Sequence, residues 1–273
     1  MKFEVIIGWL YPELMSTYGD RGNIICLQKR CEWQGIKVEV KKLDLGFKIY
    51  DLRKCDLIFM GGAQDKQQKI VSHDFSTHKV NALKDMIEDD IPGLYICGAY
   101  QFLGKYYKET DGTIVDGLNI LDLYTENPGE KHRRLIGNIV IQTSQNVILV
   151  SEAHPESLTV IRDSGQARMT SILVGFENHG GRTYLGKKVR PFATVLKGFG
   201  NNGMDKTEGA VYKNSFGSYL HGPILPKNPH FADLLIKLAL EKKYKESINL
   251  SPLDDSLEWQ AHNAIAKRMG VAI

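Results

Sequence analysis

The first hundred residues alternate short apolar segments with amphipathic ones, and this alternation constrains the fold more than any other feature. Strands are predicted where apolar residues run together or recur at period two, at 3–7, 36–40, 56–60 and 93–96. Helices are predicted between them, at 23–33 and 79–88. Strands that alternate with helices usually form a parallel sheet covered on both faces. We therefore predict an α/β fold with a mostly parallel sheet flanked by helices.

In the second half of the chain, strand-like segments follow one another with few helices between them, and this pattern predicts a β-rich extension. Strand-like segments lie at 135–142, 147–150, 158–161, 172–176, 193–197 and 216–220. A helix is expected at 229–244, with Asn228 as its cap and Pro229 in its first turn. We expect residues 1–245 to form one domain and residues 246–273 a helical tail. An amphipathic helix at 256–269 in that tail would either dock a partner or pack on its own domain.

Composition and charge argue against several classes of protein. The 273 residues carry a net charge of only +3, whereas a nucleic-acid binder concentrates Lys and Arg in one patch. No apolar run is long enough to span a bilayer, and the first residues do not resemble a signal peptide. The four cysteines form no C-x-x-C pair and no zinc-binding spacing. We expect a cytoplasmic protein with reduced thiols and no metal site.

The segment 91–104 carries the strongest chemical signal. A buried strand runs into Cys97, two small residues follow, and a helix begins. Such a turn holds a nucleophile in a strained position and needs small neighbours. The helix start favours a thiolate, and the Gly98 N–H would point to where an oxyanion forms. We interpret Cys97 as a nucleophile; the alternative is a buried structural cysteine.

Two glycines follow the apolar strand at 56–60. A turn through Gly61 and Gly62 lets backbone N–H groups approach a ligand closely. Ligands also gather at the carboxyl ends of parallel strands. We expect this turn to bind the substrate, with Gly62 as the second oxyanion donor; a plain strand-to-helix turn is the alternative.

A thiol nucleophile needs a base that takes and returns its proton. His221 follows the strand at 216–220 in a sharp turn, and His179 lies in a polar, glycine-rich loop at 175–183. The residues alone leave these two histidines as close competitors. The other six histidines, which we expect to be solvated, are at positions 73, 78, 132, 154, 230 and 262.

Cys97 in Cys-Gly-x-Tyr-Gln, with a later Tyr-Leu-His at 219–221, resembles class I glutamine amidotransferases. The similarity is closest to the cobyric acid synthase-like branch, and within it to the glutaminase subunits that work with a Mur ligase. It covers most of the chain, in ordered blocks at 18–24, 61–65, 97–101, 134–137, 175–183 and 219–225. The resemblance implies an α/β, flavodoxin-like fold of the class I glutamine amidotransferase type.

The resemblance also implies a reaction. Cys97 would attack the side-chain amide of L-glutamine, and water would hydrolyse the glutamyl thioester, with His221 as base and then acid. Arg134 would bind substrate, since a guanidinium suits the α-carboxylate of glutamine; a solvated place in the basic cluster 131–134 is the alternative. Gln101 and His179 complete the expected substrate-binding set.

The partner implied is a MurT-like Mur ligase subunit in a heterodimer. Ammonia would pass to this ligase, which amidates the D-glutamate of lipid II to D-isoglutamine in peptidoglycan biosynthesis. No cofactor is expected in this chain, because it has no Walker motif. ATP and Mg²⁺ are expected on the partner, and lipid II would be reached through the partner.

Three positions depart from the family pattern. Pro223 stands where many class I enzymes have Glu, although the cobyric acid synthase-like branch also lacks that Glu. The group that orients His221 is then an Asp or Glu of this chain or one from the partner, and we favour the partner. Ala63 and Ala99 replace frequent glycines, and we assign no function to 143–171.

Two other functions stay open. One is the glutaminase of a cobyric or cobyrinic acid amidating system, although such glutaminases are usually fused to a synthetase for which this chain has no room. The other is an inactive amidotransferase-like binding protein. The presence of both Cys97 and His221 argues against it.

Overall fold

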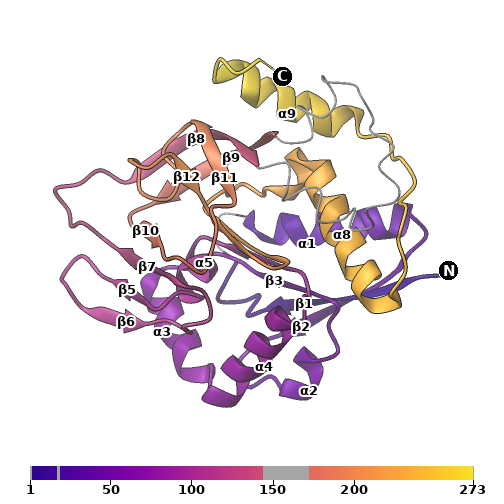
Figure 1. Cartoon of the computed structure of the whole chain (residues 1–273), viewed down its shortest axis with the longest axis horizontal. Coiled ribbons are helices and arrows are strands. Elements are labelled where there is room, and N and C mark those ends of the chain that lie inside the picture. Colours follow the sequence, from indigo (N-terminus) through magenta and orange to yellow (C-terminus); the bar gives the residue numbers. More distant parts are fainter. Residues whose placement is uncertain (1, 17–18, 144–171, 273) are drawn as a thin grey trace.

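The computed structural model describes residues 2–16, 19–143 and 172–272, and its centre is a six-stranded sheet (Figure 1). The strands are β1 (Glu4–Leu10), β2 (Lys37–Leu43), β3 (Leu57–Met60), β4 (Gly93–Ile96), β13 (Ala210–Tyr212) and β14 (Ser215–Ser218). Their order is β13-β14-β4-β3-β1-β2, and all neighbours are parallel except β13 and β14. The carboxyl ends of β3, β4 and β14 therefore meet at one edge, where the segments at 61–64, 97–98 and 219–221 follow.

Two four-stranded sheets extend the molecule on one side of this core (Figure 1). One contains β5 (Tyr106–Lys108), β6 (Ile114–Asp116), β7 (Leu123–Glu126) and β10 (Arg182–Leu185), in the order β10-β7-β5-β6. The other contains β8 (Leu135–Thr143), β9 (Ile172–His179), β11 (Ala193–Lys197) and β12 (Thr207–Glu208), in the order β12-β11-β8-β9. The second of these sheets contains the strands expected at 135–142, 172–176 and 193–197, so it is the β-rich extension expected from the second half of the sequence.

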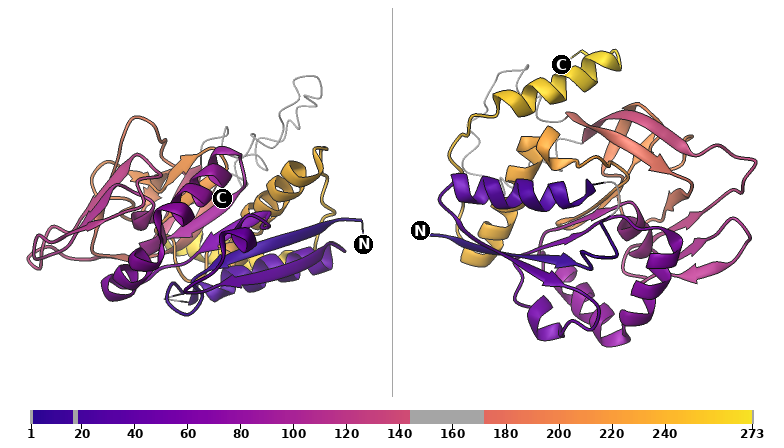
Figure 2. Two further views of the ribbon diagram at one scale, coloured as in Figure 1. Left: turned by 90° about the horizontal axis from the view of Figure 1, so that it is seen from below. Right: turned by 180° about the vertical axis from the view of Figure 1, so that it is seen from behind.

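Helices cover both faces of the central sheet, as Figures 1 and 2 show. They are α1 (Arg21–Trp33), α2 (Ile49–Leu52), α3 (Asp65–Asp74), α4 (Thr77–Glu88), α5 (Gly98–Phe102), η3 (Leu225–Lys227), α8 (Pro229–Tyr244) and α9 (Ser256–Arg268). Helices α1 and α8 pack together on one face, and α2 packs with α4 on the other. Among the described residues, no helix combines the length and the apolar character needed to cross a membrane.

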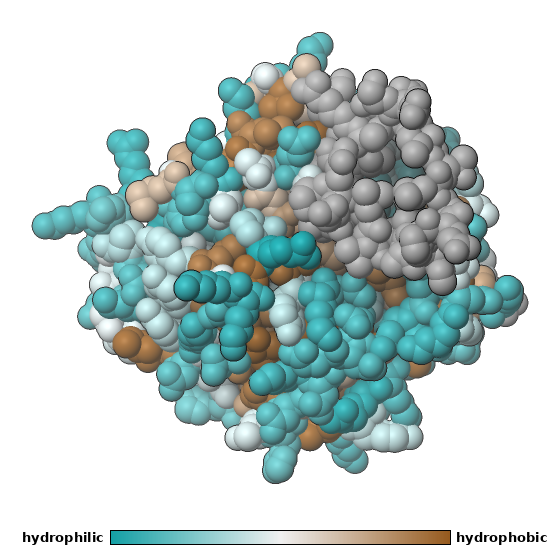
Figure 3. Space-filling view, viewed as in Figure 1, coloured by the Kyte–Doolittle hydropathy of each residue, from teal (hydrophilic) through white to brown (hydrophobic). Residues whose placement is uncertain are grey.

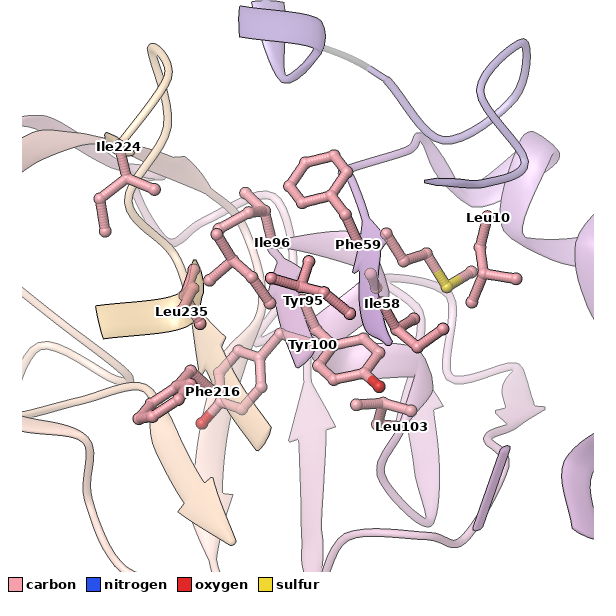
Figure 4. Close-up of a cluster of buried hydrophobic side chains, with 14 of the residues drawn as sticks. Leu10, Ile58, Phe59, Tyr95, Ile96, Tyr100, Leu103, Phe216, Ile224 and Leu235 are labelled. Carbon is pink, nitrogen blue, oxygen red and sulfur yellow. The ribbon is translucent and has the colours of Figure 1, made fainter. Parts of the chain in front are cut away.

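The core lies where the central strands are buried on both faces. All four residues of β3 and all four of β4 are buried, as expected for parallel strands between two helical layers. Figure 4 shows Ile96 of β4 beside Leu235 of α8, with Phe59 of β3 next to them. The face seen in Figure 3 is mostly hydrophilic, with smaller hydrophobic areas between the polar side chains.

Most elements predicted from the sequence form within a few residues of their expected bounds. The short strands β5, β6, β7 and β10 were not predicted, since three or four residues carry too little periodicity. The expected strands at 147–150 and 158–161, and almost all of 143–171, lie outside the described residues. Asn228 precedes α8 as expected, but its amide does not cap the helix; it bonds to the backbone of Val174 and Ile224 instead.

The tail helix α9 packs on its own domain, at the ends of β8 and β9 (Figure 1). Its Ala266 is buried in a small apolar cluster with residues of both strands. Two histidines expected to be solvated are not: His262, a residue of this helix, is fully buried, and His230 stacks on Trp259. Both expectations were wrong because apolar cover from a distant segment cannot be read from the local pattern. His154 lies outside the described residues.

Arg30 links three helices, and its replacement provides a test of the fold. The buried guanidinium donates to Asp233 of α8 at 2.7 Å and to Asp255, just before α9, at 2.5 Å. Arg30→Met would leave two carboxylates without their cation and lower the free energy of unfolding by about 3 kcal/mol in urea denaturation. Arg53→Met, which breaks the exposed pair with Asp85, should cost less than about 1 kcal/mol. Equal losses in the two variants would contradict this role.

Candidate functional site

Cys97 lies in a strained turn between β4 and α5. Its backbone has φ 51° and ψ −105°, in a region that side-chain-bearing residues avoid and that clusters at active sites. The Cys97 N–H donates to the Ser218 carbonyl at 2.8 Å, and its own carbonyl accepts from the Gln101 N–H at 3.0 Å. Backbone bonds to β14 and α5 therefore hold the elbow predicted from the sequence.

Gly98 lets the turn after β3 approach the elbow. A Cβ on Gly98 would lie 2.8 Å from the Ala63 nitrogen and 2.9 Å from Gln68 Nε2, closer than real contacts allow. The absence of a side chain at 98 thus places the backbone of Ala63 beside the backbone that follows Cys97. Two N–H groups next to a nucleophile are the usual composition of an oxyanion site.

The Gly61–Gly62 turn does not have the role expected from the sequence. The Gly62 N–H donates to Asp20 Oδ2 at 2.6 Å, so it is already occupied and does not point to an oxyanion. A Cβ on Gly61 would lie 2.4 Å from the Met15 carbonyl oxygen. Both glycines pack against the segment before α1, and the cavity is lined instead by the next two residues, Ala63 and Gln64. The Ala63 N–H replaces Gly62 as the candidate second donor.

His221 faces Cys97 from the turn after β14. Its backbone pairs with Phe176, whose carbonyl accepts the His221 N–H at 2.7 Å. The buried imidazole contacts Cys97, and its Nδ1 lies 3.6 Å from Asp20 Oδ1. Burial opposes a charge on the imidazole, but the charge of Cys97 and the interactions with Asp20 and Cys97 outweigh it and raise the pKa of His221 to about 10. The contacts with Cys97 and Asp20 thus favour the charged form of the imidazole.

Asp20 completes a row of three side chains with His221 and Cys97. It stands immediately before α1, is fully buried, and divides its two oxygens between Gly62 and His221. The carboxylate that faces His221 thus comes from this chain, which corrects our preference for one from the partner. In the sequence Asp20 lies in the family block at 18–24, but no local pattern connects it with His221.

The structure separates the two competing histidines. His179 Nδ1 hydrogen-bonds the Gly181 carbonyl at 2.8 Å, and its ring stacks on Tyr219 with centroids 3.6 Å apart. Burial lowers the pKa of His179 to about 3, so the ring is neutral and its Nδ1 carries the proton that the carbonyl accepts. His179 lines the cavity with a neutral ring, and His221 is the histidine that contacts Cys97.

A cavity of about 320 Å³ opens beside Cys97. Arg134 lies at its wall and donates from Nε to Asn178 Oδ1 at 3.1 Å. Gln101 donates from Nε2 to the Tyr219 hydroxyl at 3.0 Å, which fixes the amide in the cavity. Of the predicted site residues, the lining includes Cys97, Gln101, Arg134 and His179. Sequence reasoning did not single out Gln64, Gln68, Tyr107 and Asn178 as lining residues.

The described residues contain no cluster of three or more His, Cys, Asp or Glu side chains that could hold a metal ion. The cavity is lined by the Cys97 thiol and the Arg134 guanidinium. Next to Cys97 lie the His221 imidazole and the backbone nitrogens of Gly98 and Ala63. These groups suit the attack of a thiolate on a small acyl compound that carries a negative charge.

Comparison with known proteins identifies the family to which the chain belongs. A model of the CobB/CobQ-like glutamine amidotransferase domain matches residues 6–229. The lipid II isoglutaminyl synthase (glutamine-hydrolyzing) subunit GatD of Staphylococcus aureus is 40% identical over 270 residues, 97% of this chain and 96% of that protein. GatD of Streptococcus pneumoniae is 37% identical over 93% of this chain and 88% of its own length. A probable cobyric acid synthase of Methanothermobacter thermautotrophicus is 30% identical over 80% of this chain but 39% of its own length.

Solved structures share the fold at low sequence identity. A glutamine amidotransferase from Thermotoga maritima is 15% identical with a TM-score of 0.51, over 96% of this chain and 94% of that one. A second glutamine amidotransferase is 12% identical with a TM-score of 0.53, over 85% of this chain and 98% of that one.

Asp20→Asn tests the row of three side chains. The amide still accepts the Gly62 N–H but loses its charge, so the pKa of His221 should fall from about 10. Cys97 alkylation by iodoacetamide should become slower, because the imidazole that contacts the thiol loses part of its positive charge. We expect the alkylation to be about tenfold slower at pH 7, the factor that corresponds to a change of one unit in the pKa of His221. Asp51→Asn, which loses a partly buried pair with Lys41 far from this row, is the control, and equal alkylation rates in both variants would contradict the assignment.

Proposed function

Because the chain belongs to the CobB/CobQ-like glutamine amidotransferase family, we propose that it is the glutaminase subunit of a lipid II isoglutaminyl synthase. The observation that carries the chemistry is the buried row in which Asp20 faces His221 and His221 contacts Cys97, the one member of the row that lines the cavity. The near full-length match to two GatD subunits supports the specific enzyme.

The geometry accounts for each step of glutamine hydrolysis. The Cys97 thiolate attacks the side-chain amide carbon, and the N–H groups of Gly98 and Ala63 stabilise the oxyanion. The His221 imidazolium donates its proton to the leaving nitrogen, and ammonia departs from a glutamyl thioester. His221, now neutral, takes a proton from water, which attacks the thioester and releases glutamate and the thiolate.

The walls of the cavity orient the substrate. Arg134 offers its guanidinium to the α-carboxylate of glutamine, since a planar fork matches a carboxylate in two-point contact. Gln101 and Gln68 present amide groups near Cys97, and amides can pair with the side-chain amide of the substrate. The neutral ring of His179 closes one side without adding a charge.

The partner that would use the ammonia is a MurT-like Mur ligase subunit. This ligase would hold ATP and Mg²⁺ and activate the D-glutamate carboxylate of lipid II, and the two subunits would work in the cytoplasm. The cobyric acid alternative is weaker, because this chain spans only 39% of the cobyric acid synthase relative but 96% of a GatD subunit. The binding-protein alternative is also weaker, because a protein that only binds a ligand does not require the contact between Cys97 and His221.

Glutamate release from L-glutamine tests the function directly. The purified chain, alone and with a MurT-like partner, should release glutamate, and Cys97→Ser should reduce the rate by at least about a thousandfold. Cys26→Ser is the matched control, because burial raises the pKa of that thiol to about 12 and leaves it unreactive at neutral pH. No release from folded protein under either condition would instead support the binding-protein alternative.

Arg134→Gln should raise the KM for glutamine about tenfold with a smaller change in kcat, since a charge-assisted contact to a carboxylate contributes roughly 1.5–3 kcal/mol. Arg133→Gln is the control: it removes the neighbouring charge of the same basic cluster from a residue that does not line the cavity. If both variants raise KM equally, the effect is one of general charge, and Arg134 has no specific contact.

A further inference from the structure

The turn that follows His221 packs against the tail helix α9. Residues 222–228 contain η3, and η3 contacts both α9 and α1. The Leu225 N–H in this turn donates to Asn23 Oδ1 of α1 at 3.0 Å. The catalytic imidazole thus sits at one end of a short segment that other elements hold from several sides.

His262 of α9 anchors the far end of this turn. Its Nδ1 lies 2.9 Å from the Lys227 carbonyl oxygen and 3.1 Å from Asn228 Oδ1. Asn228 Oδ1 accepts from the Val174 N–H at 2.9 Å while its Nδ2 donates to the Val174 carbonyl, which fixes the amide orientation. Both groups facing Nδ1 are therefore acceptors, so Nδ1 carries the proton and the imidazole donates to the turn.

Lys227 carries the connection back towards the site. Its backbone carbonyl accepts from His262, and its Nζ donates to the carbonyl of Gly222, the residue after His221. Gly222 has φ 70°, a left-handed conformation that lets the chain turn sharply at this point. Burial lowers the pKa of Lys227 to about 8. The hydrogen bond to the Gly222 carbonyl partly offsets this loss of hydration, because a hydrogen bond from a charged donor is stronger than one from a neutral donor.

Helix α9 is itself firmly held. Ala266 packs against Val140 of β8 and against Ile172 and Val174 of β9. At the other end, Asp255 pairs with the buried Arg30. A rigid helix that donates to the turn can fix the position of the turn, whereas a frayed tail could not.

We propose that Lys227 and His262 are positioning residues for the catalytic His221, and that through them the C-terminal helix α9 sets the placement of the imidazole. Neither residue lines the cavity, so their effect should appear in kcat and in the reactivity of Cys97, with KM unchanged. The kinetic part rests on the proposed glutaminase function, whereas the thiol reactivity does not.

His262→Leu and His262→Asn form the decisive pair. Leucine fills the space but cannot donate, and asparagine places an N–H close to the position of Nδ1. We expect His262→Leu to lower kcat and the Cys97 alkylation rate at pH 7 about tenfold, because small misplacement of a catalytic group is costly. His262→Asn should restore both to within about twofold. If folded His262→Leu, checked by thermal unfolding, keeps the original kcat and alkylation profile, the proposal is overturned.

Lys227 gives a second test that leaves α9 untouched. Lys227→Met should lower kcat without changing KM, and Lys227→Arg, which can still donate to Gly222, should recover much of the loss. If the unchanged chain hydrolyses no glutamine yet the alkylation rates follow this order, the proposed function fails while the positioning role stands. If Lys227→Met and Lys227→Arg give the same kcat and the same Cys97 alkylation rate, Lys227 does not position His221.

Discussion

The site depends on the buried carboxylate of Asp20, whose two oxygens interact with two different parts of the chain. One oxygen holds the Gly62 N–H at 2.6 Å, and the other faces His221 at 3.6 Å. The same buried group therefore fixes the turn after β3 and favours the charged imidazole beside Cys97. Because β3, β4 and β14 are neighbours in a parallel sheet, the segments that follow them converge on this carboxylate.

The chemistry-bearing elbow could be predicted from the sequence because its signal is local. A strand, a cysteine and two small residues are enough to require the geometry seen at Cys97. The group opposite His221 could not be predicted this way, since Asp20 reaches the imidazole only after α1, β3 and β14 have packed. The competition between His179 and His221 was also undecidable locally, because burial and the Gly181 carbonyl settle the protonation of His179.

The errors at Gly61, Gly62 and His262 share one cause. A glycine pair after a strand indicates close approach of backbone, but the sequence does not say whether a ligand or the protein itself approaches. Here the Met15 carbonyl and Asp20 occupy that space, and the ligand-facing position moves to Ala63. Similarly, the polar tail around His262 gave no sign that β8 and β9 would cover it. Whether a residue is buried depends on which distant segments pack over it, and hydrophobic periodicity along the sequence does not report such packing.

The edge strand β2 has a consequence for the behaviour of the chain at high concentration. It ends the central sheet, so its outer row of N–H and C=O groups is unpaired within the sheet. Three of its seven residues are lysines, Lys37, Lys41 and Lys42, and most of its side chains are partly or fully exposed. A second copy that added a strand here would bring like charges together. The edge therefore resists the open-ended strand pairing that leads to fibres and precipitates.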